Sequence, residues 1–537
     1  MYIERLVRAR FAKTEFAAFE TPEKPMLRDG RLEVPPACLT ALAEEAARRA
    51  AFFYRRSHLE LLAAARDKAG TTAGERAIIG CLLENAVVAA EGRLPLCQDT
   101  GTACLYAWKD EGVMTAADDS ALLEQGIAAA YDKHRFRASQ VAPSSFFDEY
   151  NTGNNLPAQI RIEAAPRSGG QSPCYRFMFV AKGGGSSNKT AYFSPPPSIL
   201  TPDKFDRFLR EKITALGTAA CPPYRLAVVA GGSSPEHNLE ILKLATTELL
   251  DDAPYLDAAR IEAGRGVTGG APVIWRDAFW EKKAAEIAAG TGLGAQTGGE
   301  RLLLDVRILR LPRHAASCPI SIGVSCAAHR NLLALIDERG VFLEKLEENP
   351  RGFLDAARTG TASAGIETRR VVFDTPVKSA CAALSGLKPD AALLVTGKLL
   401  VARDAAHRLW HRLLEQGKPL PEYLFEYPVF YAGPSETPAG CVTGSIGPTT
   451  SARMDGFAEE LLSRGASLVT IGKGGRSALW TEAAGKYGGR YLTACGGAAA
   501  LIADRNIVSA KIIDYPELAM EAVRLLEVND LLVVVNG

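Results

Sequence analysis

The chain has 537 residues, more than one hydrophobic core normally organises, so we expect two or more domains. Its 62 Lys and Arg residues balance its 62 Asp and Glu residues, which argues against a chain built to bind nucleic acid or an anionic membrane surface. Hydrophobic residues (47%) and charged residues (23%) occur in proportions that are ordinary for a globular protein, and no apolar run approaches the length of a membrane span.

The 11 cysteines do not resemble the disulfide framework of a secreted protein, because their number is odd and they are spread over a long chain. The opening sequence MYIERLVRARFAKTEF is charged throughout and lacks the apolar stretch of a secretory signal. We therefore expect a reducing compartment, the cytoplasm in the first place, with a mitochondrion or another organelle as the alternative.

The first part of the chain, to about residue 130, is predicted to be mainly helical. Three segments rich in Ala, Leu and Glu carry apolar residues three and four positions apart, over 37–54, 58–69 and 75–92. Further along, residues 175–182 are predicted to form a strand that runs into the loop GGGSSNKT.

Two further patterns complete the first large unit. Residues 224–230 form a predicted strand that leads through glycines into a helix, and 331–347 are predicted to form a hairpin turning near Glu338 to Gly340. The pattern then lapses in an irregular stretch, within which 361–372 are predicted to be an interdomain linker.

Beyond the linker, predicted strands and helices alternate, which is typical of a domain with a partly parallel sheet. In this alternation the segment PELAMEAVRLLEV (516–528) is expected to be a helix. The predicted fold class is α/β, with a larger mixed α/β N-terminal domain that begins with helices (1–360) and a smaller α/β C-terminal domain (373–537).

Three cysteines lie beside glycine, proline or small polar residues: Cys97 in LPLCQDTGTA, Cys221 in TAACPPY and Cys326 in GVSCAAHRN. Taken singly, each is explained as well by a buried thiol or a capped turn. Together they suggest an iron–sulfur cubane, which normally takes four thiolates; with three, one iron stays open to bind a substrate. The spacing of the cysteines matches neither a zinc CxxC pair nor a ferredoxin run. Cys318 is the alternative to Cys326 as the third ligand.

Glycine-rich loops recur in the chain, among them AKGGGSSNKT, GSIGPTTSARMD and IGKGGRS. None fits a P-loop or a dinucleotide fingerprint, whereas backbone N–H groups beside Lys or Arg suit carboxylate oxygens. Arg403 opens a predicted helix after a long apolar strand, and Arg453 and Lys473 follow glycine-rich turns. Each alone would be taken for a surface charge, but several in one domain indicate an anion pocket.

At these residues the chain resembles the iron–sulfur (class I) fumarases. The resemblance extends over nearly the whole length, through LPLCQDTGTA, NTGNNLPAQI, AKGGGSSNKT, GTAACPPY, LPRHAASCP, GVSCAAHRN, YAGPSETPAG, GSIGPTTSARMD and GKGGRS. It implies a hydro-lyase that interconverts fumarate and (S)-malate, with a [4Fe–4S] cluster whose open iron is a Lewis acid. It also implies a homodimer, in which the larger domain carries the cluster and a smaller domain of the swivelling type closes the active site.

The resemblance also implies the site residues. The cluster ligands would be Cys97, Cys221 and Cys326; the substrate would contact Gln98, Arg137, Gly184, Arg403 and Arg453; the catalytic groups would be Asp99, Thr449, His314 and Lys473. Asp99 is expected to protonate the departing hydroxyl and Thr449 to move the C3 proton, whereas His329 and His407 are expected to be structural.

Two alternatives stay open at this point. A related hydro-lyase acting on mesaconate and citramalate, or on tartrate, would carry the same motifs, because a pocket discriminates one methylene by only about 1–3 kcal/mol. A non-catalytic iron–sulfur redox sensor would need the thiols, but it would give no reason for the acidic and basic residues around them.

Overall fold

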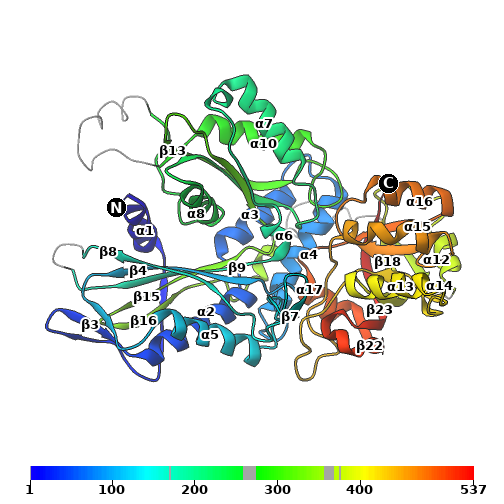
Figure 1. Ribbon diagram of the computed structural model, residues 1–537, viewed down its shortest axis with the longest axis horizontal. Coiled ribbons are helices and arrows are strands. Elements are labelled where there is room, and N and C mark those ends of the chain that lie inside the picture. The colour runs from blue at the N-terminus through cyan, green and yellow to red at the C-terminus, as the bar shows by residue number, and fades with distance from the viewer. Residues whose placement is uncertain (1, 168–170, 258–273, 356–367, 374–375, 537) are drawn as a thin grey trace.

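The computed structural model describes residues 2–167, 171–257, 274–355, 368–373 and 376–536 (Figure 1). A six-stranded sheet forms the first layer of the N-terminal part, and helices α2 (Pro36–Phe52) and α5 (Asp119–Lys133) pack together on one of its faces. The strand order is β1 (Phe16–Phe19), β16 (Gly340–Glu344), β15 (Arg330–Asp337), β9 (Tyr175–Lys182), β4 (Thr102–Asp110), β8 (Gln159–Ala165).

A second, five-stranded sheet lies above the first in Figure 1. Its central strand β11 is buried along its whole length, because helix α8 covers one face and α7 and α10 cover the other. Alternate residues of β11 accordingly belong to different cores, Ala227 with α8 and Val228 with α10. The elements are β10 (Ala191–Phe193), β14 (Ile320–Ser325), β11 (Tyr224–Gly232), β13 (Leu303–Arg313), β12 (Trp275–Arg276), α7 (Pro202–Thr214), α8 (Pro235–Ala245) and α10 (Ala278–Gly290).

The C-terminal part is built on a mixed seven-stranded sheet. Strands β17 to β21 run parallel to their neighbours, and β23 pairs antiparallel with both β21 and β18, so that part of the sheet closes on itself. The strands are β17 (Thr368–Phe373), β18 (Ala392–Val401), β19 (Val429–Phe430), β20 (Val469–Gly472), β21 (Arg490–Ala494), β23 (Val523–Val535) and β22 (Ile507–Asp514). The helices are α12 (Val377–Ala383), α13 (Asp404–Glu415), α14 (Tyr423–Glu426), α15 (Ala458–Leu462), α16 (Ala478–Tyr487) and α17 (Ala499–Leu501).

Short elements complete the fold. They are α1 (Tyr2–Lys13), a small sheet of β2 (Met26–Arg28), β3 (Arg31–Val34) and β5 (Val113–Thr115), the hairpin of β6 (Val141–Pro143) and β7 (Glu149–Asn151), α6 (Gly184–Ser187) and α11 (Gly352–Asp355). No described helix is both long and apolar enough to cross a membrane.

The two parts share a core. Helices α3 (Arg56–Asp67) and α4 (Ala73–Ala89) contribute Leu62 and Leu82 to the same buried cluster as Val395 and Ile471 of the C-terminal sheet. Buried Asn85 of α4 strengthens this junction, because its side-chain amide donates to the carbonyl oxygens of Leu96 (2.9 Å) and Gly497 (3.3 Å). The loop that follows α4 is therefore held against the C-terminal part.

Most local expectations are confirmed. The three early helices are α2, α3 and α4, the strand 175–182 is β9, and the hairpin near Glu338 to Gly340 joins β15 to β16. The expectation of a mainly helical start was too simple, because β1 to β5 lie within it.

Two segments differ from expectation. Residues 516–528 form a 3-10 turn, η4 (Pro516–Glu521), and then β23, because the apolar residues of this segment fill the sheet between β18 and β22. Most of the expected linker lies outside the described residues, and its last part, 368–372, belongs to β17.

Candidate active site

Three loops bring three cysteines to one cavity. Cys97 lies between α4 and β4, Cys221 between α7 and β11, and Cys326 between β14 and β15. All three line a cavity of about 320 Å³, and the backbone N–H of Ala327 donates to the Cys221 carbonyl oxygen at 3.0 Å. That bond ties two of the cysteine loops together directly.

Burial shifts two of the three thiols, Cys97 and Cys221, towards their protonated form. Burial raises the pKa of Cys97 despite the nearby Arg330, and burial raises that of Cys221 to about 11 although Lys473 opposes the shift. A bound metal would reverse this, because its positive charge stabilises thiolates. The ammonium of Lys473 already donates to the Cys221 sulfur at 2.8 Å.

The arrangement fits a cluster better than a single ion. Among the described residues, no group of three or more His, Cys, Asp or Glu side chains is placed to hold one metal ion. In an iron–sulfur cubane each thiolate binds a different iron, so the cysteine sulfurs lie farther apart than the ligands of a single ion. All 11 cysteines are free, and the three thiols face a shared cavity. The residues present therefore suit a cubane with three protein ligands.

A glycine keeps the space around Cys221 open. A Cβ atom on Gly496 would lie 2.5 Å from the Cys221 sulfur and 3.0 Å from the Lys473 Cδ atom. The side chain of Gln296 holds this glycine from two sides, since it accepts from the Gly496 N–H (2.8 Å) and donates to its carbonyl oxygen (2.9 Å). Cys221 and Lys473 therefore leave no room for a methyl group on Gly496.

We expect Gly496→Ala to lose most of its bound iron and sulfide while keeping its secondary structure, because the new methyl group displaces Cys221. Iron and sulfide analysis after anaerobic reconstitution, with circular dichroism, measures both effects. Gly485→Ala is the matched control, since a Cβ there meets nothing within 4 Å. Full cluster content in Gly496→Ala would contradict the close approach of Gly496 to Cys221.

Asp99 is a partly buried carboxylate held in a defined orientation. It accepts a hydrogen bond from the backbone N–H of Gly184 at 2.8 Å, and Arg137 approaches its other oxygen at 3.5 Å. Burial alone would raise the pKa of Asp99, but Arg137, Arg330 and the Gly184 N–H outweigh it and leave the pKa below its usual range. The group is thus ionised and faces the same cavity as the thiols.

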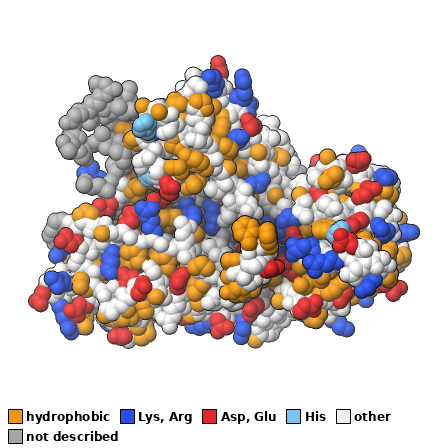
Figure 2. All heavy atoms as spheres, viewed as in Figure 1, with side chains coloured by type: hydrophobic (Ala, Val, Ile, Leu, Met, Phe, Trp, Pro, Cys, Tyr) orange, Lys and Arg blue, Asp and Glu red, His pale blue; other side chains and the backbone are white. Residues whose placement is uncertain are grey.

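Cationic side chains from the C-terminal part close the other side of the cavity. Arg403 precedes α13, Arg453 lies in η2 (Ser451–Phe457), and Lys473 follows β20. An outer cavity of about 870 Å³ shares Arg403, Arg453 and Asp99 with the inner one and leads into it. Lys and Arg side chains gather where the two parts of the molecule meet (Figure 2).

Two acidic residues that the sequence did not single out hold these arginines. Glu521 accepts from Arg403 Nη2 at 2.7 Å and from the Ala405 N–H at 2.9 Å, and Asp404 accepts from Arg453. Because Arg403 and Arg453 repel one another, the two carboxylates keep both guanidinium groups at the cavity.

We expect Glu521→Gln to raise KM by about tenfold or more, with a smaller change in kcat, because a charged hydrogen bond that orients Arg403 is worth about 1.5–3 kcal/mol. Steady-state kinetics measure the split. Glu517→Gln is the control, since Glu517 lines the same outer cavity without this bond. An unchanged KM in Glu521→Gln would show that Arg403 does not depend on this carboxylate.

The structure brings nearly all the predicted residues together. The inner cavity is lined by Cys97, Gln98, Asp99, Arg137, Gly184, Cys221, Cys326, Arg403, Thr449, Arg453 and Lys473. Thr449 is fixed by its backbone, which donates to the Tyr431 carbonyl (2.7 Å) and accepts from the Lys473 N–H (3.1 Å). Cys318 packs in the core beneath α7 and α10 and does not line this cavity, which favours Cys326 as the third ligand.

His314 is the exception among the predicted catalytic residues. It is exposed, it does not line the inner cavity, and its Nδ1 atom accepts from the Ala316 N–H at 3.2 Å. The loop that carries it follows the end of β13, so within one chain the motif LPRHAASCP does not place it beside the thiols. His329 and His407 are buried and hydrogen-bonded, as their expected structural role requires.

Comparison with known proteins gives the following similarities. A family model described as "Fumarate hydratase (Fumerase)" matches residues 40–334, and one described as "Fumarase C-terminus" matches residues 340–536. The chain is 41% identical over 499 residues to "Fumarate hydratase class I, anaerobic" of Escherichia coli strain K12, covering 93% of this chain and 88% of the relative.

Two more relatives are similar over comparable lengths. "Fumarate hydratase class I, aerobic" of the same strain is 40% identical over 501 residues, covering 93% of this chain and 88% of the relative. "Fumarate hydratase 2" of Leishmania major is 39% identical over 526 residues, covering 96% and 89%. The similarity thus includes both the part that carries the three cysteines and the part that carries Arg403, Arg453 and Lys473.

Proposed function

This chain belongs to the class I fumarate hydratase family and is a hydro-lyase, and from that premise we propose that it interconverts fumarate and (S)-malate at the inner cavity. The observation that carries the proposal is the convergence of three thiols, the Asp99 carboxylate and a group of cations on one cavity of about 320 Å³. A dicarboxylate needs cations for both of its ends, and the cavity offers Arg137 from the N-terminal part and Arg403, Arg453 and Lys473 from the C-terminal part.

We propose that Cys97, Cys221 and Cys326 hold a [4Fe–4S] cluster. When bound, it would supply an open iron that polarises the hydroxyl and one carboxylate of the substrate as a Lewis acid. The cations of the chain act on the other carboxylate of the substrate, where negative charge accumulates as the C3 proton leaves. Arg403, Arg453 and Lys473 stabilise that charge with preorganised donors.

Two proton transfers complete the proposed reaction. In the direction of dehydration, the C3 proton passes to the Thr449 hydroxyl oxygen as that hydroxyl gives its own proton to solvent, and the C–O bond breaks. Asp99, which is ionised in the free chain, first takes up a proton from solvent and then delivers it to the departing hydroxide to give water. In the direction of hydration the ionised Asp99 takes that proton from water instead. The Gly184 N–H and Arg137 hold the carboxylate in place for either direction.

Three further points belong to this proposal. The chain acts as a homodimer, and a catalytic role for His314 depends on that assembly because this residue lies outside the cavity of its own chain. The domain boundary falls within the predicted linker 361–372, so that the C-terminal domain can close on the cluster-bearing one. The expected compartment is the cytoplasm or an organelle with comparable redox conditions.

Anaerobic reconstitution with iron and sulfide tests the proposal. We expect the reconstituted chain to convert malate to fumarate, to lose activity in air, and to regain it with Fe²⁺ and thiol. Tartrate and citramalate are assayed beside malate, and a higher kcat/KM for either would replace fumarate and malate by that substrate pair. Air-stable turnover by iron-free protein would overturn the cluster mechanism.

A further inference from the structure

Arg330 is a buried cation with no carboxylate at ion-pairing distance among the described residues. It opens β15, it is only 2% exposed, and it lines the inner cavity. Its Nε and Nη1 atoms are buried without a hydrogen-bond partner, and among the described residues no carboxylate oxygen lies within 4 Å of its guanidinium nitrogens. An unpaired buried charge of this kind destabilises a fold strongly unless a ligand compensates it.

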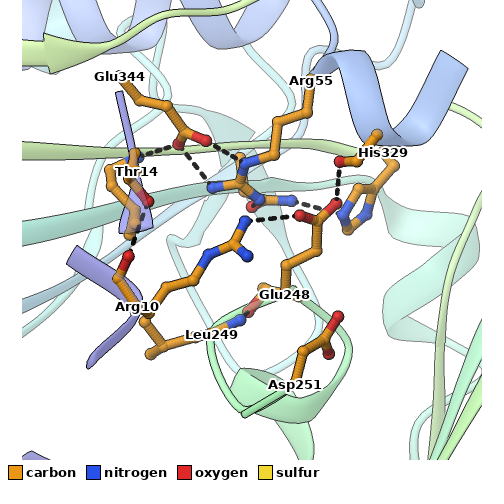
Figure 3. A network of polar contacts seen from close by, with 12 residues as sticks. Arg10, Thr14, Arg55, Glu248, Leu249, Asp251, His329 and Glu344 are labelled. Atoms are coloured by element: carbon orange, nitrogen blue, oxygen red, sulfur yellow. Dashed lines mark hydrogen bonds and ion pairs between the residues drawn. The ribbon is translucent and has the colours of Figure 1, made fainter. Parts of the chain in front are cut away.

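Two buried carboxylates of the N-terminal part, Glu344 and Glu248, are occupied by other arginines. Glu344 accepts from Arg55 at 2.6 and 2.8 Å, and Glu248 accepts from Arg225 at 2.7 Å and from Arg10 at 2.6 Å. Figure 3 shows this network, with Glu344 and Glu248 on either side of Arg55. No carboxylate in it is left over to neutralise another cation.

The network also determines which way Arg330 points. Its two neighbours in the chain face the network, since Asn331 accepts from Arg55 and its side-chain amide bonds to His329 Nε2 at 2.8 Å. Successive residues of a strand face opposite sides, so the Arg330 side chain is directed away from the network. It reaches the cavity beside Gly183, where a Cβ atom would lie 3.6 Å from its Nη2 atom and 3.1 Å from an Asp99 oxygen.

The groups that surround the guanidinium are those of the proposed cluster site. Burial lowers the pKa of Arg330, but the thiols of Cys97 and Cys326 and the carboxylate of Asp99 outweigh it. Two of these three groups are proposed iron ligands from different loops. A cubane bound between them would lie within reach of the unpartnered N–H groups.

We propose that Arg330 is a cofactor-binding residue, whose guanidinium neutralises the negative charge of the cluster and donates its free N–H groups to it. The inference rests on the proposed function. Its physical consequence is a reversal of sign: in the iron-free chain Arg330 destabilises the fold, and in the cluster-bound chain it stabilises both the fold and the reduced state of the cluster.

The test compares Arg330→Met and Arg330→Lys with Arg301→Met. Arg301 is a matched control, because it is also a buried arginine of the N-terminal part, but it is hydrogen-bonded to Thr71 and to the Ala69 carbonyl and lies outside the inner cavity. Each full-length variant is measured iron-free and after anaerobic reconstitution. The readouts are melting temperature, the rate of iron loss to a chelator, and the midpoint potential of the cluster from a redox titration followed by electron paramagnetic resonance.

For Arg330→Met we expect a higher melting temperature than the parent without iron, and iron loss at least tenfold faster with the cluster bound. A tenfold shift in the one-electron reduction equilibrium would lower the midpoint potential by about 59 mV, since a positive charge favours the reduced cluster. Arg330→Lys should lie nearer the parent in potential. Arg301→Met should melt lower in both states and leave the potential unchanged.

Two results would overturn the inference. The first is that the cluster of Arg330→Met has the parental potential and the parental rate of iron loss. The second is that both Arg330 variants lose the cluster and also melt at a lower temperature without iron, which would assign Arg330 to folding alone. If Arg330→Met takes up no iron but Arg330→Lys does, the charge is required and the inference stands. A parent chain that binds a cluster but shows no hydratase activity would instead contradict the proposed function.

Discussion

Cys221→Ser is expected to lose the brown iron–sulfur absorbance and the hydratase turnover together. Under the proposed function Cys221 is one of three cluster ligands, and without it the loop between α7 and β11 offers no thiolate to the cubane. The variant should still fold, because serine occupies nearly the same volume and Cys221 lies at the cavity wall. Iron and sulfide content, absorbance and turnover after anaerobic reconstitution measure the effect.

Cys318→Ser separates this effect from the loss of any thiol. Cys318 is fully buried among the core residues of α7 and α10, so its replacement should lower the melting temperature but leave cluster content and turnover per cluster unchanged. The reverse pattern, with the cluster kept in Cys221→Ser and lost in Cys318→Ser, would transfer the ligand role to Cys318.

Lys473→Met is expected to lower kcat by about 10²–10³, as does the loss of one preorganised donor at a developing anion in other enzymes. Its ammonium group is partly buried, lies 2.8 Å from the Cys221 sulfur and lines the inner cavity, so it can face both the proposed cluster and the substrate. Its pKa is held above the ordinary value, because the thiols outweigh the effect of burial, and it therefore stays charged. Methionine keeps the length of the side chain and removes the charge.

The design must distinguish a catalytic loss from a lost cluster. Turnover is therefore expressed per bound cluster, and Lys486→Met serves as the control because Lys486 lies in the same domain on an exposed helix, paired with Glu459. A kcat per cluster equal to that of the parent in Lys473→Met would remove Lys473 from the reaction and leave Arg403 and Arg453 as the stabilising cations.

The acidic partners of the arginines explain how a crowded cationic site can exist in a neutral chain. Burial, together with the positive charges of Arg137 and Arg453, lowers the pKa of Arg403. Glu521 and Asp404 each take one guanidinium at its outer edge, which leaves the remaining N–H groups for a substrate carboxylate. The cavity is thus prepared for an anion without a net positive charge on the whole molecule.

The sequence alone was sufficient for most of the local elements and for most of the side chains that line the inner cavity. Helices α2, α3 and α4 and the hairpin of β15 and β16 follow from periodicity and turn residues, which act between neighbours in the chain. The motifs around Cys97, Cys221 and Lys473 likewise drew attention to residues that do converge on one cavity.

Only the tertiary structure decided which charges surround those side chains and which predicted residues lie outside the inner cavity. Nothing in the local sequence distinguishes Arg330 from Arg225. Yet Arg225 forms ion pairs with Glu248 and Asp305, whereas Arg330 has no carboxylate at ion-pairing distance among the described residues. Long-range contacts also decided two other outcomes. His314 lies outside the inner cavity of its own chain, and residues 516–528 form a turn and a strand instead of a helix. Burial and ion pairing depend on groups hundreds of positions apart, so their outcome exists only once the strands and loops have met.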